Sequence, residues 1–290
     1  MRFYTIEKDN KEQVAVEIEN GKLALLESLG ITVCDMNELI RRYEELENAI
    51  KGACKAPAAE SLDLAECRIL APIPVPVGDV LCLGVNYREH IEETVHITDF
   101  TKKKDAVYFS KHANRCNDPD GVIPAYEFVD CLDYEVELGV VLKKDVLSVS
   151  HEEAHDAIFG YTIVNDVSAR NLQFKHQQWF RGKSLDGYLP MGPCIVTKEE
   201  IPDAYDLDLF CYVNEEERQH SNTSKMITSI EEAISELSQG MTLKAGTIIA
   251  TGTPGGVAMG MKNPVYLKKG DKVRCVIKGI GELINTVGEK

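Results

Sequence analysis

Apolar and polar residues alternate most regularly in the stretch 132–142. In its first half apolar side chains occupy every second position, and the acidic residues Asp133, Glu135 and Glu137 stand between them. A period of two predicts a half-buried β-strand. The wholly apolar end of the stretch predicts that this strand continues into a core covered on both faces.

The acidic side chains of this strand suggest a metal site. Glu135 and Glu137 are two residues apart, which places them roughly 6–7 Å from each other on one face of the strand. Two carboxylates this close inside a fold repel each other and lose the favourable free energy of hydration. A cation between them would compensate for both costs. The alternative is an acidic row that faces solvent, which is common on antiparallel strands.

The first part of the chain is predicted to be a small leading module. Apolar residues at 3–6 and 14–18 predict two strands, and a capping box predicts a helix from Asp35 through Ile50. A linker at 55–60 and a proline-rich stretch follow. We therefore divide the chain into domains 1–70 and 71–290.

Strands and short helices are mixed in the second domain. A helix is predicted after Ser150, a buried strand up to Asp166, a hairpin over 206–223, a capped helix over 229–237, and two closing strands.

Composition and charge exclude several classes of partner. The 290 residues are 44% hydrophobic and 27% charged, which is ordinary for a globular protein, and the net charge is −15. This acidity argues against a nucleic-acid or anionic-membrane partner. No apolar run approaches the roughly 18 residues of a membrane span. The nine cysteines form no CxxC pair, so we expect a reduced, cytoplasmic protein.

Several polar residues beyond position 80 are candidates for catalysis or substrate binding. His90 and Glu93 stand at i, i+3 on a predicted helix, where the carboxylate can orient the imidazole as a general base. Arg170 and Gln173 have the same spacing and suit a substrate carboxylate. Lys183 lies in a loop between glycine and serine. The alternatives are an incidental surface ion pair and a solvated lysine.

A literal HExxH motif, HEEAH, occupies 151–155. In a zinc metalloprotease this motif lies inside a helix, both histidines face a cleft, and a third residue completes the ligand set. Here His151 falls at the very start of a short helix, and no third ligand is evident. A solvated first turn is the preferred interpretation, and a zincin-type metalloprotease is a remote alternative.

Taken together, five ordered motifs resemble the fumarylacetoacetate hydrolase superfamily. They are GVNYREH, DYEVELGVV, GYTIVNDVSARNLQ, GKSLDGYLPMGP and IIATGTPGGV, spread over about 70–287. The resemblance implies an α+β, mainly β fold: a mixed β-roll preceded by a small N-terminal α+β cap domain.

The resemblance also implies a site with one Mg²⁺ or Mn²⁺. An all-oxygen ligand set suits such a hard divalent ion better than it suits zinc. The ion polarises a 2-oxo acid, so that negative charge can build up on an enolate. The implied metal ligands are Glu135, Glu137 and Asp166; the implied substrate contacts are Arg170, Gln173, Lys183 and Thr253; and the implied catalytic residues are His90, Glu93 and Lys183.

The implied activity is metal-dependent hydrolysis of a C–C bond in an acylpyruvate or related β-diketo acid. Oxaloacetate decarboxylation is a nearly equal alternative, because it uses the same chelate without an attacking water. Isomerases and dehydratases of 2-oxo acids follow. A non-catalytic scaffold would have lost a ligand or the His90–Glu93 dyad, and neither is lost. The resemblance further implies a homodimer.

Two departures from the family pattern concern the substrate. Val85 stands where many relatives carry Arg or Lys, so one cation is missing near the cleft. The stretch 92–104 matches no specific subfamily, although it is expected to shape the distal pocket beside a lid that carries the dyad. The sequence therefore leaves the identity of the 2-oxo acid open.

Overall fold

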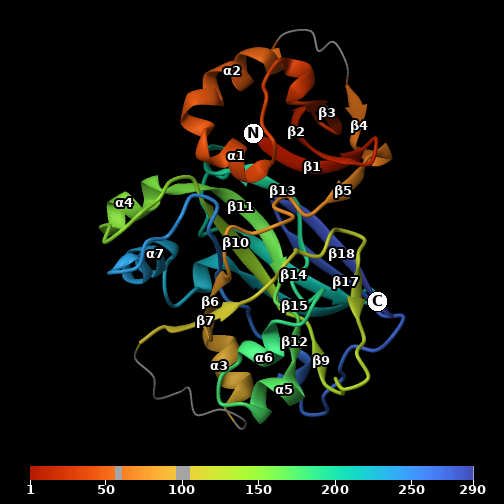
Figure 1. Cartoon of the computed structure of the whole chain (residues 1–290). Helices are drawn as coiled ribbons and strands as arrows, with labels where there is room; N and C mark the ends of the chain where they lie inside the picture. The colour runs from red at the N-terminus through yellow and green to blue at the C-terminus, as the bar shows by residue number, and fades with distance from the viewer. Residues whose placement is uncertain (56–60, 96–104, 290) are drawn as a thin grey trace.

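The computed structural model describes residues 1–55, 61–95 and 105–289. Its N-terminal part is a small antiparallel sheet packed against two helices (Figure 1). The strands predicted around 3–6 and 14–18 are both present and pair with each other. The elements are β1 Arg2–Lys8, β2 Lys11–Glu19, β3 Lys22–Leu25, β4 Leu62–Asp63, β5 Arg68–Leu70, α1 Met36–Arg41 and α2 Tyr43–Lys55.

The single helix predicted from Asp35 through Ile50 is in fact two helices. Its start is as predicted, since the Asp35 carboxylate accepts the backbone N–H of Glu38 at 2.7 Å. The helix is interrupted at Arg42, which has φ −102° and ψ 6°. The Arg42 guanidinium donates to the Thr32 carbonyl (3.1 Å) and to Glu38 (3.0 Å). These contacts tie the junction to the preceding loop.

The remaining elements alternate as the sequence pattern predicts. The strands are β6 Val80–Gly84, β7 Val107–Lys111, β8 Val122–Pro124, β9 Leu132–Asp133, β10 Val136–Leu142, β11 Ile158–Asn165, β12 Ser168–Ala169, β13 Met191–Thr197, β14 Asp208–Val213, β15 Glu216–Asn222, β16 Ile248–Ala250, β17 Lys272–Ile277 and β18 Gly281–Gly288. The helices are α3 Arg88–Thr94, α4 His151–Asp156, α5 Arg170–Lys175, α6 Phe180–Lys183 and α7 Ile230–Ser238.

Eleven strands of the described chain form one mixed sheet. Its order is β4-β3-β2-β1-β13-β11-β10-β16-β6-β7, and β5 pairs with β1. Most neighbours are antiparallel, but β16 and β6 are parallel, with Ile249 opposite Leu81. The N-terminal strands join the rest through β1 and β13, where Arg2 pairs with Val196. The fold is thus α+β and mainly β, as predicted.

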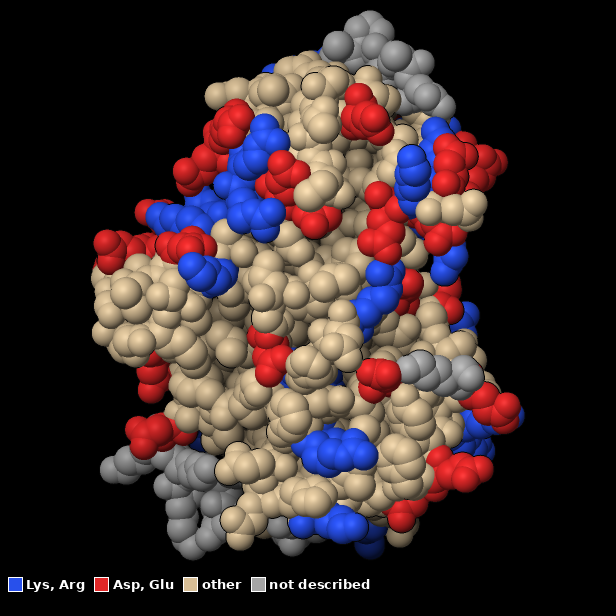
Figure 2. All heavy atoms as spheres, in the orientation of Figure 1, with Lys and Arg blue, Asp and Glu red and all other residues tan. Residues whose placement is uncertain are grey.

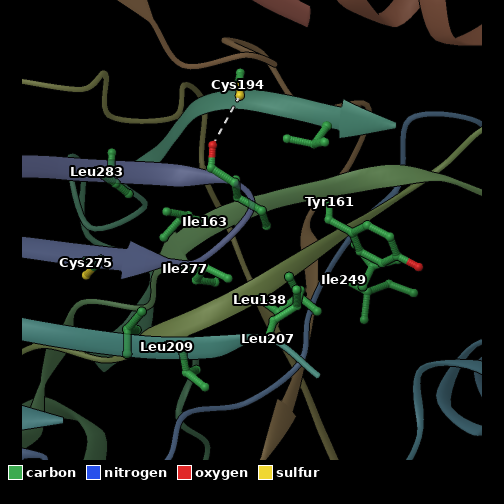
Figure 3. Close-up of a cluster of buried hydrophobic side chains, with 14 of the residues drawn as sticks. Leu138, Tyr161, Ile163, Cys194, Leu207, Leu209, Ile249, Cys275, Ile277 and Leu283 are labelled. Carbon is green, nitrogen blue, oxygen red and sulfur yellow. Dashed lines mark hydrogen bonds between the residues drawn. The ribbon is translucent and has the colours of Figure 1, made fainter. Parts of the chain in front are cut away.

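A second sheet packs against the first and closes the core. Its order is β15-β14-β17-β18-β8. Figure 3 shows Leu138 and Ile163 of the large sheet facing Leu209, Ile277 and Leu283 of the second sheet. All five side chains are buried, so the removal of their apolar surface from water holds the two sheets together.

Aromatic side chains join the N-terminal part to the large sheet. Phe3 of β1 stacks on Phe159 of β11, with ring centroids 6.0 Å apart. Tyr43 at the start of α2 meets Phe159 edge to face at 4.9 Å. Since all three rings are buried, the two parts share one continuous apolar interior.

The elements that carry the chemical motifs gather at one end of the molecule. In Figure 1, α3, α5 and α6 lie at the end farthest from the N-terminal part. β10 lies between β11 and β16 in the large sheet, and α3 follows the neighbouring strand β6. The strand ends and these short helices therefore converge on the same region.

Charged side chains on the face in Figure 2 are intermixed. Lys and Arg stand among Asp and Glu, most densely around the N-terminal part. Many form ion pairs, such as Arg42 with Glu38 (3.0 Å) and Lys51 with Glu47 (2.7 Å). None of the described helices is long and apolar enough to cross a membrane.

Candidate metal and substrate site

Backbone hydrogen bonds bring the break between β9 and β10 next to the end of β11. Tyr134 and Glu135 lie between the two strands, so the single strand predicted over 132–142 is interrupted. The N–H of Glu135 donates to Asn165 Oδ1 (3.0 Å), and the N–H of Asp166 donates to the Glu135 carbonyl (2.9 Å). These bonds fix the positions of two carboxylates, one just before β10 and one just after β11.

Glu135, Glu137 and Asp166 converge on one point, and we call them the carboxylate cluster. Each offers an oxygen within 4.8 Å of the others, and this is the one group of its kind among the described residues. Their exposed fractions are 4%, 1% and 0%. The alternative of an acidic row facing solvent is therefore wrong.

Two buried lysines contact the carboxylate cluster. Lys183 Nζ lies 2.7 Å from Glu135 Oε2 and 2.6 Å from Asp166 Oδ2. The Nζ of Lys111, the last residue of β7, lies 2.7 Å from Asp166 Oδ1 and donates to the Val167 carbonyl (2.9 Å). Burial of an ammonium group is costly unless it is paired, so these contacts are needed for the fold itself. Lys111 was not predicted as a site residue from the sequence. The one feature that could have identified it is its position at the end of an apolar strand.

Arg170 is held by three neighbours. Its Nε donates to Asp133 Oδ2 (2.9 Å), its Nη1 donates to Gln173 Oε1 (3.0 Å), and its Nη2 lies 2.6 Å from Glu135 Oε1. Asp133 also accepts the N–H groups of Ala258 and Met259. Arg170 therefore orients Glu135 and Gln173, and Asp133, which was not predicted as a site residue, holds Arg170 in place.

The electrostatics around Glu135 favour its ionised form. Burial opposes ionisation, but the nearby Lys183 and Arg170 cations outweigh this effect and lower the pKa of Glu135 to about 2. Glu135 is consequently a carboxylate at any pH near neutrality, as a metal ligand has to be.

Glu137 has the opposite environment. Burial, together with the negative charges of Asp166 and Glu135, raises its pKa well above the usual range. Its Oε2 accepts only one neutral donor that the structure shows, the N–H of Gly252 at 2.8 Å. A cation beside the cluster would relieve this repulsion, so the residues present fit a hard divalent ion with oxygen ligands.

His90 and Glu93 meet at the edge of the same cavity. His90 Nδ1 lies 2.7 Å from Glu93 Oε1 on α3, and Glu93 Oε2 accepts the N–H of Gly256 at 2.7 Å. A Cβ added at Gly260 would lie 2.5 Å from the Glu93 carboxyl carbon. The glycine-rich loop after β16 thus lets α3 approach closely and holds Glu93 in position.

A partly open cavity joins these groups. Its polar lining comprises Glu135, Glu137, His90, Arg170, Gln173, Lys183 and Thr253. The rest of its lining is mostly apolar and comprises Leu83, Gly84, Val85, Thr94, Phe109, Phe174, Trp179 and Met259. Val85, the position at which a cation was predicted to be missing, therefore belongs to the mostly apolar part of the lining.

Thr253 lines the cavity, but its hydroxyl is already used within the fold. Its Oγ1 donates to the Val136 carbonyl (3.0 Å) and accepts from Gln219 Nε2 (2.7 Å). These bonds attach the glycine-rich loop to the start of β10. A substrate contact of Thr253 remains a prediction.

The HExxH histidines do not join the site. They lie on α4, and His155 Nδ1 is 2.9 Å from Glu231 Oε1 of α7. Both histidines are exposed. Two other predicted segments lie partly outside the described residues: the linker at 55–60, beyond Lys55, and the stretch at 92–104, beyond Val95.

Three known proteins are similar over nearly the whole chain. Oxaloacetate tautomerase YisK of Bacillus subtilis (strain 168) is 45% identical over 303 residues, covering 99% of this chain and 100% of the relative. Mitochondrial oxaloacetate tautomerase Fahd2a of Rattus norvegicus is 35% identical, covering 99% and 91%. Maleylpyruvate hydrolase from Sphingobium sp. SYK-6, solved with manganese(II) ion and pyruvate, has a TM-score of 0.80 and 28% identity, covering 100% and 99%.

The family match covers most of the chain as well. Residues 79–288 match the fumarylacetoacetate (FAA) hydrolase C-terminal family. This range contains the carboxylate cluster, the His90–Glu93 pair and the glycine-rich loop. The chain therefore belongs to the fumarylacetoacetate hydrolase family of enzymes, as its five motifs predicted.

Proposed function

We propose that this protein catalyses the keto–enol tautomerisation of oxaloacetate with the help of a divalent metal ion, Mg²⁺ or Mn²⁺. Two relatives that cover nearly the whole chain bear the name oxaloacetate tautomerase. A structural neighbour was solved with manganese(II) and pyruvate, a 2-oxo acid. The observation that carries the proposal is that His90 lines the same cavity as Glu135 and Glu137, the two glutamates that cluster with Asp166.

The carboxylate cluster would hold the ion through its oxygen atoms. A bound divalent ion supplies positive charge that stabilises the developing enolate. Lys183 and Gln173 line the same cavity and would position the substrate carboxylates. Arg170 bonds Gln173 Oε1, so it leaves the amide N–H groups of Gln173 for the substrate.

His90 would move the proton. Glu93 occupies Nδ1, so Nε2 is the ring nitrogen left for the substrate. A neutral imidazole takes the proton from C3, and the electron pair of the C–H bond becomes the C2–C3 double bond. The proton returns to the oxygen on C2. Tautomerisation needs no water and breaks no carbon–carbon bond.

Hydrolysis of an acylpyruvate is the second candidate. The same His90–Glu93 pair can activate a water molecule instead of accepting a proton from carbon. The similarity to a maleylpyruvate hydrolase favours this reaction. Oxaloacetate decarboxylation, isomerisation and dehydration share the enolate and are distinguished by their products.

One set of assays separates these reactions. The enol of oxaloacetate is followed by ultraviolet absorbance, and pyruvate released from oxaloacetate or acetylpyruvate is measured with lactate dehydrogenase. We expect metal-dependent tautomerisation without pyruvate release, and a loss of at least about 100-fold in His90→Ala, since general acid–base catalysis contributes roughly 10²–10⁴-fold. His112→Ala, at a half-exposed histidine paired with Asp79, is the matched control and should keep full activity.

Each result has a distinct meaning. Pyruvate from acetylpyruvate would favour the hydrolase, and pyruvate from oxaloacetate would favour the decarboxylase. Full activity after removal of metal ions with EDTA, or in His90→Ala, would contradict the proposed mechanism. No reaction with either acid would refute both candidates.

A further inference from the structure

The apolar wall of the cavity is built around the one tryptophan of the chain. Trp179 immediately precedes α6, and the N–H of Lys183 donates to its carbonyl at 3.2 Å. Residues four apart on a helical turn lie on the same face. α6 therefore presents the Lys183 ammonium and the Trp179 indole to the same cavity.

The wall leads away from the carboxylate cluster in two steps. Lys183 Nζ lies over the Phe109 ring, 5.3 Å from its centroid. The Phe109 ring meets the Trp179 ring edge to face at 5.1 Å. Trp179 and Phe109 thus form one apolar surface beside the Lys183 ammonium, and the tail of a 2-oxo acid would point toward this surface if its carboxylate and keto oxygens faced the cluster.

Gly84 fixes the depth at which the indole lies. A Cβ added there would be 2.5 Å and 2.9 Å from two indole carbons. Glycine at the end of β6 therefore allows Trp179 to lie directly against the strand.

We propose that Trp179, resting on Gly84 and Phe109, limits the length of the 2-oxo acid and restricts the site to short substrates. This inference rests on the proposed function for the orientation of the acid. Trp179 acts by occupying the space into which a longer tail would extend. It is a specificity-determining residue and takes no part in proton transfer.

Binding and turnover are measured separately. Dissociation constants of pyruvate, 2-oxobutanoate and 2-oxohexanoate are determined by calorimetry on the Mn²⁺-loaded protein, and oxaloacetate tautomerisation is followed in parallel. In the parent we expect 2-oxohexanoate to bind at least about tenfold more weakly than pyruvate. Trp179→Ala should tighten it roughly fourfold for each methylene that gains burial, the equivalent of about 0.8 kcal/mol per CH₂. Trp179→Leu should have an intermediate effect.

Phe180→Ala is the matched control. Phe180 is the next residue, is 48% exposed and does not line the cavity. This variant should keep the parental order of affinities. The same order in Trp179→Ala and Trp179→Leu, with oxaloacetate still turned over, would overturn the inference and leave the proposed function standing.

Gly84→Ala gives the opposite test. The added methyl group should push the indole into the cavity, so that pyruvate and 2-oxohexanoate both bind more weakly, the longer acid more so. In the Trp179→Ala background the same change should have little effect, because the clashing ring is gone. Equal effects of Gly84→Ala in both backgrounds would refute the contact as the cause.

The two proposals can fail separately. Trp179→Ala could relax the length preference in binding while neither the parent nor any variant tautomerises oxaloacetate. In that case the proposed reaction is wrong and the role of Trp179 holds. If the loaded parent binds none of the three acids, the 2-oxo acid site and the role of Trp179 both fall.

Discussion

At the scale of single residues, the charges buried beside each carboxylate determine its pKa. Lys183 bridges Glu135 and Asp166, whereas Glu137 receives the neutral N–H of Gly252. This difference explains why the pKa of Glu137 is raised by burial and by its two acidic neighbours. Glu137 is consequently the carboxylate of the cluster that would gain most from a bound divalent cation.

Replacing Glu137 with Gln should separate fold stability from metal binding. The metal-free variant should be at least as stable as the parent, because it loses one like charge and its side-chain oxygen can still accept the Gly252 N–H. We expect Mg²⁺ or Mn²⁺ to raise the Tm of the parent, and this rise should disappear in the variant, because one of the three proposed ligands is lost. Calorimetric scans with and without metal test both expectations.

Glu127→Gln is the control for this experiment. Glu127 is exposed and lies outside the carboxylate cluster. Its variant should keep the metal-dependent rise in Tm. An undiminished rise in Glu137→Gln would mean that the ion is held without Glu137.

Sequence patterns identified the site residues whose partners are nearby in the sequence. They missed the residues whose partners are far away in the sequence. Glu135 and Glu137 share a short strand pattern, and His90 and Glu93 share a helical spacing, so both pairs were visible. Lys111 belongs to the site because it pairs with Asp166, which is 55 residues away in the sequence. Asp133 was grouped with the alternating acidic row, yet the break after β9 turns it toward Arg170. Such partners depend on tertiary contacts that no local pattern contains.

At the scale of elements, period and capping predicted most strands and helices, and irregular junctions were missed. The hairpin over 206–223 appears as β14 and β15, and the capped helix over 229–237 appears as α7. The breaks within 132–142 and at Arg42 were not predicted. The first interruption is held by a hydrogen bond to Asn165 and the second by one to Thr32 in the preceding loop, and neither bond changes the local hydrophobic pattern.

The helices α4 and α7 are tied to each other by a buried acid. Glu231 of α7 is 7% exposed, and its carboxylate accepts hydrogen bonds from the Tyr205 hydroxyl and from His155 of α4. Burial works against its ionisation, but these two partners outweigh burial and lower the pKa of Glu231 below its usual value. The ionised form is thus favoured in the folded protein.

This lowered pKa has a definite pH signature. Since the folded pKa lies below the unfolded value of about 4.3, the stability from Glu231 is complete above that pH and is lost as pH falls through the folded pKa. Glu231→Gln should therefore lower the free energy of unfolding at pH 7 by about 1.5 kcal/mol, the lower end for a hydrogen bond to a charged group. The difference from the parent should shrink toward zero as the pH falls below the folded pKa of Glu231, as measured by urea unfolding.

The exposed Glu19 supplies a comparison for the pH series. Glu19→Gln should match the parent at every pH within about 0.5 kcal/mol, as expected for a surface substitution. A deficit in Glu231→Gln that persists unchanged at low pH would show that lost packing, rather than lost charge, causes it.

At the scale of the whole molecule, the continuous sheet bears on the division of the chain at residue 70. β1 pairs with β13, and Phe3 stacks on Phe159 inside one apolar interior. If the N-terminal part were removed, β13 would become an edge strand and Phe159 would lose its aromatic partners. Backbone pairing and shared burial of this kind predict that 1–70 and 71–290 unfold together.

Phe159→Ala tests this coupling. Its ring is 2% exposed and contacts Phe3 and Tyr43. The substitution should lower the free energy of unfolding by about 3–5 kcal/mol, as is typical for a buried phenylalanine. Far-ultraviolet circular dichroism reports on both parts, and fluorescence of Trp179 reports on the second part alone, so the two urea transitions should still coincide. Phe128→Ala, at a ring that is 51% exposed, should cost far less. An earlier transition by dichroism than by fluorescence in Phe159→Ala would mean that the N-terminal part unfolds as an independent domain.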